Sequence, residues 1–214
     1  MSTATRSETP SSVPLLRNAP VQARSNARLT SLLDAAAAVI AESGYERLTT
    51  AMIAERAGSS IGTVYRYFPE RIAVLHALAA RAMERFESDG VPAIEAGARR
   101  SWTAAVDALV EFWIDQSRVE PGFRSLRFGD VLDLRPRETE VAANAVIASR
   151  VADILRSESA LESSDIEPAL EVAIEICDAL VARAFAFDGE GDDVFVAAAR
   201  SAPRDYLLSR FPAA

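Results

Sequence analysis

Apolar residues recur three or four positions apart along most of the chain, which is the spacing of one face of an α-helix. No alternation with a period of two is long enough to predict a β-strand. Glycine and proline are few and alanine is abundant, and alanine favours helix over strand. The sequence therefore predicts an all-α fold.

The first predicted helix covers residues 26–43 and ends at Gly44, because glycine adopts the left-handed conformation that closes a helix at little cost. Its apolar stripe consists of Leu29, Leu32, Leu33, Ala36, Val39 and Ile40. Further helices are predicted over residues 49–57, 60–68, 70–88, 101–119, 123–133, 137–157, 165–187 and 192–211. Thr49 is the expected N-cap of the second helix, and Ser59 or Ser60 that of the third. A break is expected at residues 89–92, and Pro203 is expected to break or kink the last helix.

Residues 44–75 hold two short predicted helices separated by a turn of about three residues that contains Gly58. This is the pattern of a helix-turn-helix. Ala54 is small enough to let the second helix cross closely over the first, and Gly58 allows the tight turn without a side-chain clash. The residues that can face the core are Ile53, Val64 and Phe68.

The opposite side of the second helix of this motif carries Gly62 and Arg66, with Thr63, Tyr65 and Tyr67 on the flanks. A glycine inside a helix costs about 0.5–1 kcal/mol relative to alanine, so its presence suggests that the backbone approaches a partner closely. A DNA strand would be such a partner. The alternative is that a glycine in the first turn costs little and has no functional meaning.

This segment resembles the helix-turn-helix of the TetR (tetracycline-repressor) family, over about residues 26–75. The matching residues, in uninterrupted spacing, are Thr49, Thr50, Ile53, Ala54, Ala57, Gly58, Ser60, Gly62, Thr63, Tyr65, Tyr67, Phe68, Arg71 and Leu75. Two positions depart from the family pattern: Ser59 stands where valine is usual, and Arg71 where lysine is usual. Ser59 puts one small apolar contact in question, whereas Arg71 keeps the charge and can still bind a phosphate oxygen.

The resemblance implies that the exposed residues of this motif bind double-stranded DNA. Thr49 and Thr50 would hold a phosphate at the N-terminus of the first helix, where free N–H groups and the helix dipole favour anions. The other implied phosphate ligands are Thr63, Tyr67 and Arg71. The implied surface in the major groove consists of Ser60, Ile61, Gly62, Tyr65 and Arg66. Arg66 is the best candidate for reading a base, because a guanidinium can bind guanine through two hydrogen bonds. For the two tyrosines packing is the alternative, and for Arg66 plain solvation.

The net charge of −8 argues against nucleic-acid binding, but the distribution of charge does not. Residues 1–71 carry eight arginines and six acidic residues, whereas residues 72–214 carry fifteen arginines and twenty-five acidic residues. A basic head on an acidic body fits a protein that turns one end toward DNA. The chain contains no lysine, so every cationic side-chain contact comes from arginine.

The sequence offers no candidate site for catalysis, a metal or a cofactor. One histidine, His76, and one cysteine, Cys177, cannot make a usual transition-metal site, and the apolar run around Cys177 is typical of a buried thiol. No catalytic triad can be assembled around His76, and there is no glycine-rich phosphate loop. We therefore expect no enzymatic activity. No apolar stretch reaches the roughly 18 residues of a membrane span and no signal peptide is seen, so a cytoplasmic protein is expected.

Three segments are predicted: a flexible arm over residues 1–22, a DNA-binding domain over 23–70, and a helical regulatory and dimerisation domain over 71–214. Arginines of the arm could touch the minor groove of DNA, and an unstructured tail is the alternative. Residues 120–133 and the C-terminal end resemble, more loosely, C-terminal regions of the same family. This implies a ligand pocket among the middle helices and a homodimer formed through the last two long helices. The helix over 165–187 is apolar around much of its circumference, so it must be buried against a partner subunit or in the centre of a monomer.

Candidate ligand-binding residues in the regulatory domain are Phe86, Trp102, Phe112, Trp113, Phe123, Arg127, Phe128 and Asn144. The aromatic residues could form apolar walls and Arg127 or Asn144 could orient a polar group, with plain core packing as the alternative. The leading hypothesis is a homodimeric repressor that binds a palindromic operator and is released by an unknown small-molecule effector. The alternatives are a helical ligand-binding protein or enzyme with a vestigial helix-turn-helix, and a DNA-binding protein without a ligand.

Overall fold

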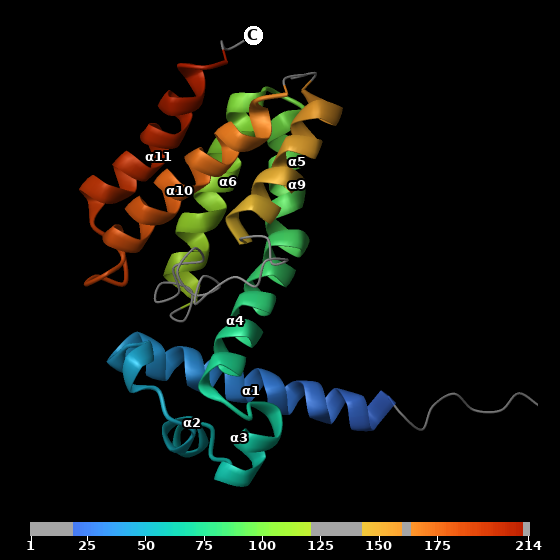
Figure 1. Ribbon diagram of the computed structural model, residues 1–214, viewed down its shortest axis with the longest axis vertical. Helices are drawn as coiled ribbons and strands as arrows, with labels where there is room; N and C mark the ends of the chain where they lie inside the picture. The colour runs from blue at the N-terminus through green and yellow to red at the C-terminus, as the bar shows by residue number, and fades with distance from the viewer. Residues whose placement is uncertain (1–18, 121–142, 160–163, 212–214) are drawn as a thin grey trace, which may run out of the picture.

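A computed structural model describes residues 19–120, 143–159 and 164–211, and every regular element in these ranges is a helix, which confirms the all-α prediction (Figure 1). In the first part of the chain the elements are α1 (Ala19–Ser43), η1 (Tyr45–Arg47), α2 (Thr50–Arg56), α3 (Ile61–Tyr67), α4 (Arg71–Arg85) and η2 (Phe86–Gly90). They are followed by α5 (Val91–Ala98), α6 (Trp102–Val119), α9 (Ala143–Glu158), α10 (Ile166–Ala184) and α11 (Asp193–Leu208). The helix predicted over 123–133 lies outside the described residues.

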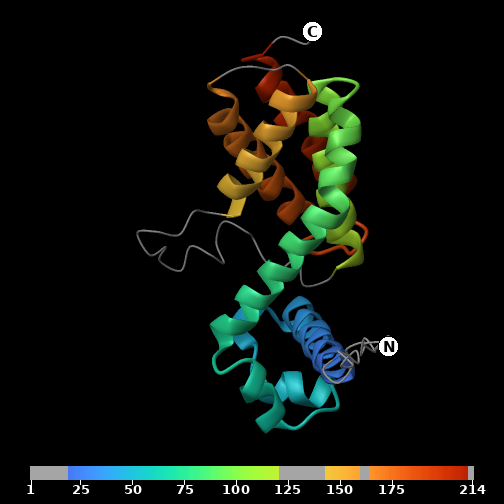
Figure 2. The same ribbon diagram turned by 90° about the vertical axis from the view of Figure 1, so that its right-hand side faces the viewer.

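The helices form two parts, a head of α1, η1, α2 and α3 and a body of α5, α6, α9, α10 and α11, joined by α4 (Figures 1 and 2). Each part has its own apolar core. The core of the head ends at Leu78, in the middle of α4, and the core of the body begins at Phe86. The part of α4 that follows Leu78 therefore forms the neck between two separate cores.

The helix α1 begins earlier than the sequence predicted. It starts at Ala19 rather than near residue 26, so residues 19–22, which were expected in the flexible arm, are helical. The physical reason is that Pro20 stands in the first turn, where a missing N–H is tolerated and the fixed φ of proline suits a helix. The next residues are ordinary helix formers. Residues 1–18, with Arg6 and Arg17, lie outside the described residues.

The break predicted at residues 89–92 is wrong. Gly90 and Val91 both have right-handed helical backbone angles, and η2 is a π-helical turn that joins α4 to α5. Pro92 stands in the first turn of α5, and the wider π-turn before it accommodates the missing backbone hydrogen bond. A Cβ at Gly90 would lie 3.0 Å from Cδ2 of Phe86 and 3.3 Å from the ring of Phe112. Gly90 is thus explained by close packing inside a continuous helical path.

The last helix is not broken either, because α11 runs through Pro203, which is buried within it. The main contact of α11 is with α10, and the two lie side by side (Figure 1). The residues of α10 buried against α6, α9 and α11 include Leu170, Ile174 and Val181. On the outer side of this helix Val172 is 44% exposed. One apolar face of α10 is therefore buried inside the subunit, and part of a second apolar face is exposed to solvent.

Candidate nucleic-acid interface

The two helices of the motif are capped by the side chains that the sequence indicated. Oγ1 of Thr49 accepts a hydrogen bond of 3.2 Å from the backbone N–H of Met52, at the start of α2. Oγ of Ser60, rather than that of Ser59, accepts one of 3.1 Å from the backbone N–H of Thr63, at the start of α3. These bonds satisfy N–H groups that the first turn of a helix leaves without an intrahelical partner.

The turn between α2 and α3 depends on Gly58, whose φ of +57° lies in the left-handed region. The chain then reverses so tightly that the N–H of Ser59 donates to the carbonyl of Ala54 at 2.8 Å. Ile53 and Val64 are fully buried and Phe68 is nearly so, which confirms their predicted place in the core. The burial of α2 and α3 on one side fixes which side of α3 remains outside.

The outer side of α3 carries unusually large apolar groups for a solvent-facing helix. Ile61 is 49% exposed and Tyr65 is 53% exposed, and Gly62 and Arg66 are exposed between them. A Cβ at Gly62 would meet nothing within 4 Å, so packing within the chain does not require glycine at this position. The face formed by Ile61, Gly62, Tyr65 and Arg66 is called the recognition face below.

Two candidate phosphate ligands beside this face are already hydrogen-bonded. Oγ1 of Thr63 lies 2.9 Å from Oγ of Ser60. The hydroxyl of Tyr67 lies 3.1 Å from Oγ of Ser25, on the part of α1 whose early start the sequence did not predict. The guanidinium of Arg66 lies 5.5 Å from the centre of the Tyr67 ring, a cation–π contact that orients both side chains. Thr50, the remaining candidate at the start of α2, is half-buried.

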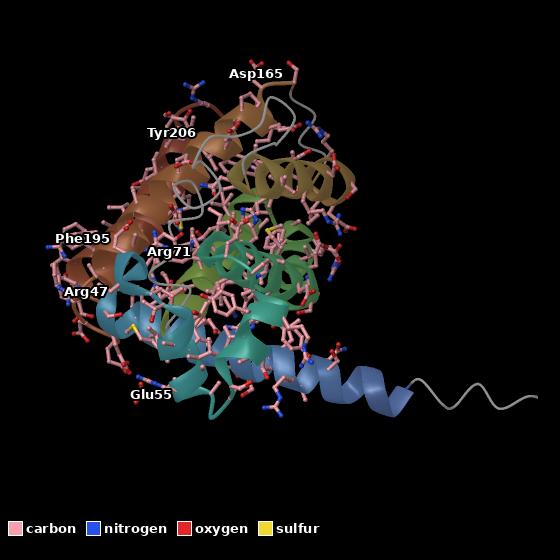
Figure 3. All side chains as sticks on the ribbon, turned by 60° about the horizontal axis from the view of Figure 1, so that its bottom comes forward. Arg47, Glu55, Arg71, Asp165, Phe195 and Tyr206 are labelled. Carbon is pink, nitrogen blue, oxygen red and sulfur yellow. The ribbon has the colours of Figure 1, made fainter. Side chains whose placement is uncertain are left out.

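Arg71 has partners that sequence reasoning missed. Its guanidinium donates to the backbone carbonyl of Glu46 at 2.9 Å and lies 4.5 Å from the centre of the Tyr45 ring. In Figure 3, which brings the head forward, Arg71 and Arg47 project from neighbouring parts of the head. Arg71 therefore anchors the start of α4 to η1 and still keeps about 44% of its side chain exposed for a phosphate. Tyr45 and Glu46 precede it by about 25 positions, so no local pattern could indicate this contact.

The aromatic residues proposed for a ligand pocket belong to the core of the body. Phe86, Trp102 and Trp113 are buried, and Phe112 packs against Phe86 edge to face with a ring-centre separation of 6.0 Å. Trp113 borders an apolar cavity between α6, α10 and α11 of only about 10 Å³, the space of one water molecule at most. Within the described residues these aromatics are therefore core side chains. Phe123, Arg127 and Phe128 lie outside the described residues.

Asn144, the polar candidate, is fully buried at the start of α9. Its Nδ2 donates to a carboxylate oxygen of Glu175 at 2.7 Å. Its Oδ1 has no hydrogen-bond partner among the residues that the structure describes. A buried amide oxygen in this state can accept a hydrogen bond from a ligand donor.

Among the described residues, the remaining cysteine, histidine and acidic side chains form no second site. Cys177 is buried, and burial raises the pKa of its thiol to about 12, with a smaller contribution from the neighbouring carboxylate of Asp178. His76 is exposed on α4. Among the described residues no three His, Cys, Asp or Glu side chains gather as metal ligands would. No helix in the same residue ranges has the length and apolar character needed to cross a membrane.

Two family models match the chain and together cover both parts of the molecule. Residues 32–78 match the model described as bacterial regulatory proteins, tetR family, and residues 100–211 match the model described as tetracyclin repressor-like, C-terminal domain. The first match includes the whole helix-turn-helix and the first half of α4. The second covers about half of the chain.

Similar proteins of known name agree with these matches. The repressor KstR of Rhodococcus jostii is 41% identical over 63 residues, which is 29% of this chain and 30% of KstR. The nucleoid occlusion factor SlmA of Actinobacillus pleuropneumoniae is 34% identical over 93 residues, 42% of this chain and 44% of SlmA. The chain thus aligns with less than half the length of these relatives. A TetR-family regulator from Streptomyces coelicolor matches in structure over 86% of this chain and 99% of its own, with a TM-score of 0.65 and 29% identity.

Proposed function

The chain belongs to the TetR family and is a DNA-binding transcriptional regulator, and we propose that it is a ligand-responsive homodimeric repressor of a palindromic operator. The observation that carries the proposal is the recognition face of α3. Its exposed isoleucine and tyrosine lie beside an open glycine and an exposed arginine. The helix that carries them is capped by Ser60 and packed into the core of the head through Val64. Such a face suits the major groove, where apolar groups meet thymine methyl groups and arginine meets guanine.

The proposed phosphate ligands frame this face. Thr49 and Thr50 stand at the N-terminus of α2. Thr63 stands in the first turn of α3, Tyr67 at the end of α3, and Arg71 at the start of α4. Contacts of this kind fix the register of a protein on DNA, whereas Arg66 and the groups beside it read the bases. The boundary near residue 70 between DNA-binding and regulatory domains stays a prediction, since the core of the head includes α4 as far as Leu78.

A second subunit is proposed to pair with the outer side of α10 and α11. Val172 on α10 is 44% exposed and Leu208 on α11 is 37% exposed. The same two helices also expose the small residues Ala179 and Ala197, which would let another helix approach closely. Pairing here would present two recognition faces to half-sites about one DNA turn apart, 34–36 Å. This is the geometry of a palindromic operator.

Responsiveness to a small molecule is proposed for the body. Its support is the buried carbonyl oxygen of Asn144, which has no hydrogen-bond partner in the described part of the chain, within a domain rich in buried aromatic side chains. A ligand with a hydroxyl or N–H group would satisfy this oxygen. A specific ligand raises the melting temperature by mass action, so a thermal-shift screen of hydroxylated and amide-bearing small molecules tests this part. Loss of the shift in Asn144→Leu would place the ligand at this residue.

The experiment that tests the DNA-binding proposal is selection of duplexes from a fragmented genomic library, followed by a salt titration on the enriched duplex and on a scrambled one. We expect Arg66→Ala to weaken binding to the enriched duplex by about 1–3 kcal/mol and to relax its sequence preference. Arg100→Ala is the matched control, because Arg100 is also an exposed arginine and lies in the turn between α5 and α6 of the body. No enriched duplex, or equal losses in the two variants, would contradict the proposal.

A further inference from the structure

The head and the body have separate apolar cores, so apolar packing alone does not fix how the head is oriented on the body. The core of the head ends at Leu78 and that of the body begins at Phe86, with Ala82 and Met83 already packed against the body. Between these two sets one charged residue of α4, Arg81, is only 15% exposed in its side chain. A guanidinium this far from water needs charged or polar partners to offset its lost hydration.

Arg81 finds one partner on each side of the neck. Its Nη1 lies 2.5 Å from Oδ1 of Asp34, which is on α1 in the head. Its Nη2 lies 2.5 Å from Oε1 of Glu120, which follows the last turn of α6 in the body. The two amino groups of one planar guanidinium thus join two segments that are far apart in sequence, and the fixed geometry of the fork sets the angle between them.

The body end of this connection is reinforced. The second carboxylate oxygen of Glu120 pairs with Arg85, one helical turn further along α4. Arg85 also donates to Oε1 of Gln116 on α6 at 3.3 Å. The side chain of Glu120 is itself only 15% exposed. The end of α6 is therefore held to α4 by three polar contacts, two from Glu120 and one from Gln116. On the side of the head Arg81 has one polar contact, that with Asp34, beside the apolar packing of the first half of α4.

We infer that Arg81 is a positioning residue that latches the DNA-binding head to the regulatory body through Asp34 and Glu120. The inference deepens the proposed function, since it rests on the head being the DNA-binding part and the body the regulatory one. The Asp34 side is the weaker one, because Asp34 is 62% exposed and water can replace its contact.

The latch is tested by measuring the distance between head and body in the 214-residue chain. Ala41→Cys in α1 and Ala96→Cys in α5 introduce exposed sites for a donor and an acceptor dye. Native Cys177 is buried with a pKa raised to about 12, so it does not compete for the dyes. Mixing with excess unlabelled chain leaves at most one labelled subunit in any dimer. Single-molecule energy transfer then gives the distribution of head-to-body distances.

We expect one narrow distribution for the protein with Arg81 and a broader one for Arg81→Met, which keeps the length of the side chain and removes its charge. Asp34→Asn should broaden the distribution in the same way, and its exposed position leaves the fold intact. Glu42→Gln is the matched control, because Glu42 also lies on α1 but pairs with Arg56 inside the head. An unchanged distribution in both Arg81→Met and Asp34→Asn would overturn the latch.

The outcome is separable from that of the proposed function. The distance measurement uses no DNA, so a broadened distribution together with no enriched duplex supports the latch and contradicts the repressor. An enriched duplex together with unchanged distances supports the repressor and contradicts the latch. A lower melting temperature without a change in distance shows a merely structural role for Arg81 and also overturns its positioning role.

Discussion

Gly62 offers a substitution for which folding and DNA binding are expected to change in opposite directions. In Gly62→Ala the added Cβ meets nothing within 4 Å in the protein. Gly62 lies within α3 and has no positive φ, so alanine can adopt the same backbone conformation. Alanine is favoured over glycine inside a helix by about 0.5–1 kcal/mol. For a chain of this size such a gain raises the melting temperature by about 1–4 °C.

The same Cβ stands on the recognition face between Ile61 and Tyr65, which is proposed to enter the major groove. If the backbone of α3 lies against DNA, the methyl group must displace the helix from its contacts. We expect at least a tenfold weaker binding of the enriched duplex, which is about 1.4 kcal/mol. Fluorescence anisotropy at fixed salt measures the affinity, and thermal denaturation of the free protein measures the stability.

Gly58→Ala is the comparison that separates the two effects. Its added Cβ also meets nothing within 4 Å, but the φ of +57° makes alanine strained there, so the variant should be less stable by about 1–2 kcal/mol. Gly62→Ala should therefore be more stable than the parent protein and should bind the duplex more weakly than the parent does. If Gly62→Ala binds the duplex as tightly as the parent does, the hypothesis that the backbone at Gly62 lies close to DNA is refuted.

Three further outcomes follow from other parts of the structure. Val172→Glu should shift the protein toward monomer in sedimentation velocity, because it puts a charge on the proposed subunit contact, and persistence of the parent's state would contradict that contact. Glu111 pairs with Arg200, and that hydrogen bond lowers the pKa of the carboxyl, so the pair stabilises the fold above pH 4.5 and loses its effect as pH falls through the lowered pKa. Glu111→Gln should therefore cost at most about 1 kcal/mol in urea unfolding at pH 7 and nothing at strongly acidic pH. Cys177 should react with iodoacetamide only at the rate of unfolding, and fast labelling of the native protein would contradict its burial.

The helix-turn-helix was predictable because each of its determinants is local. Thr49 and Ser60 cap helices that begin at the next residue, Gly58 supplies a positive φ between them, and Val64 and Phe68 are one helical turn apart. Each of these roles involves partners within about four positions, which is the range that periodicity and capping rules describe. The helix-turn-helix could therefore be predicted from one sequence.

The errors arose where tertiary packing overrides a local signal. Gly90 and Pro92 predict a break by the usual rules, but the ring of Phe112, twenty-two positions from Gly90, packs where a side chain on that glycine would stand. The π-helical turn keeps the path helical and carries α4 into α5 without interruption. Nothing in the local pattern distinguishes a glycine that breaks a helix from one that lets another helix approach.

The arginines show the same limit more sharply, because in a chain without lysine all cationic side chains look alike in the sequence. Arg66 remains exposed on the recognition face, Arg71 is bound to the carbonyl of Glu46, and Arg81 is nearly buried between Asp34 and Glu120. Their different tasks depend on acceptors that lie 25 to 47 positions away along the chain. At the neck the guanidinium of Arg81 on α4 pairs with the carboxylates of Asp34 on α1 and of Glu120 at the end of α6. These three residues come together only when the chain has folded. For this reason the DNA-reading residue could be proposed from sequence, whereas the residue that orients the DNA-reading domain required the structure.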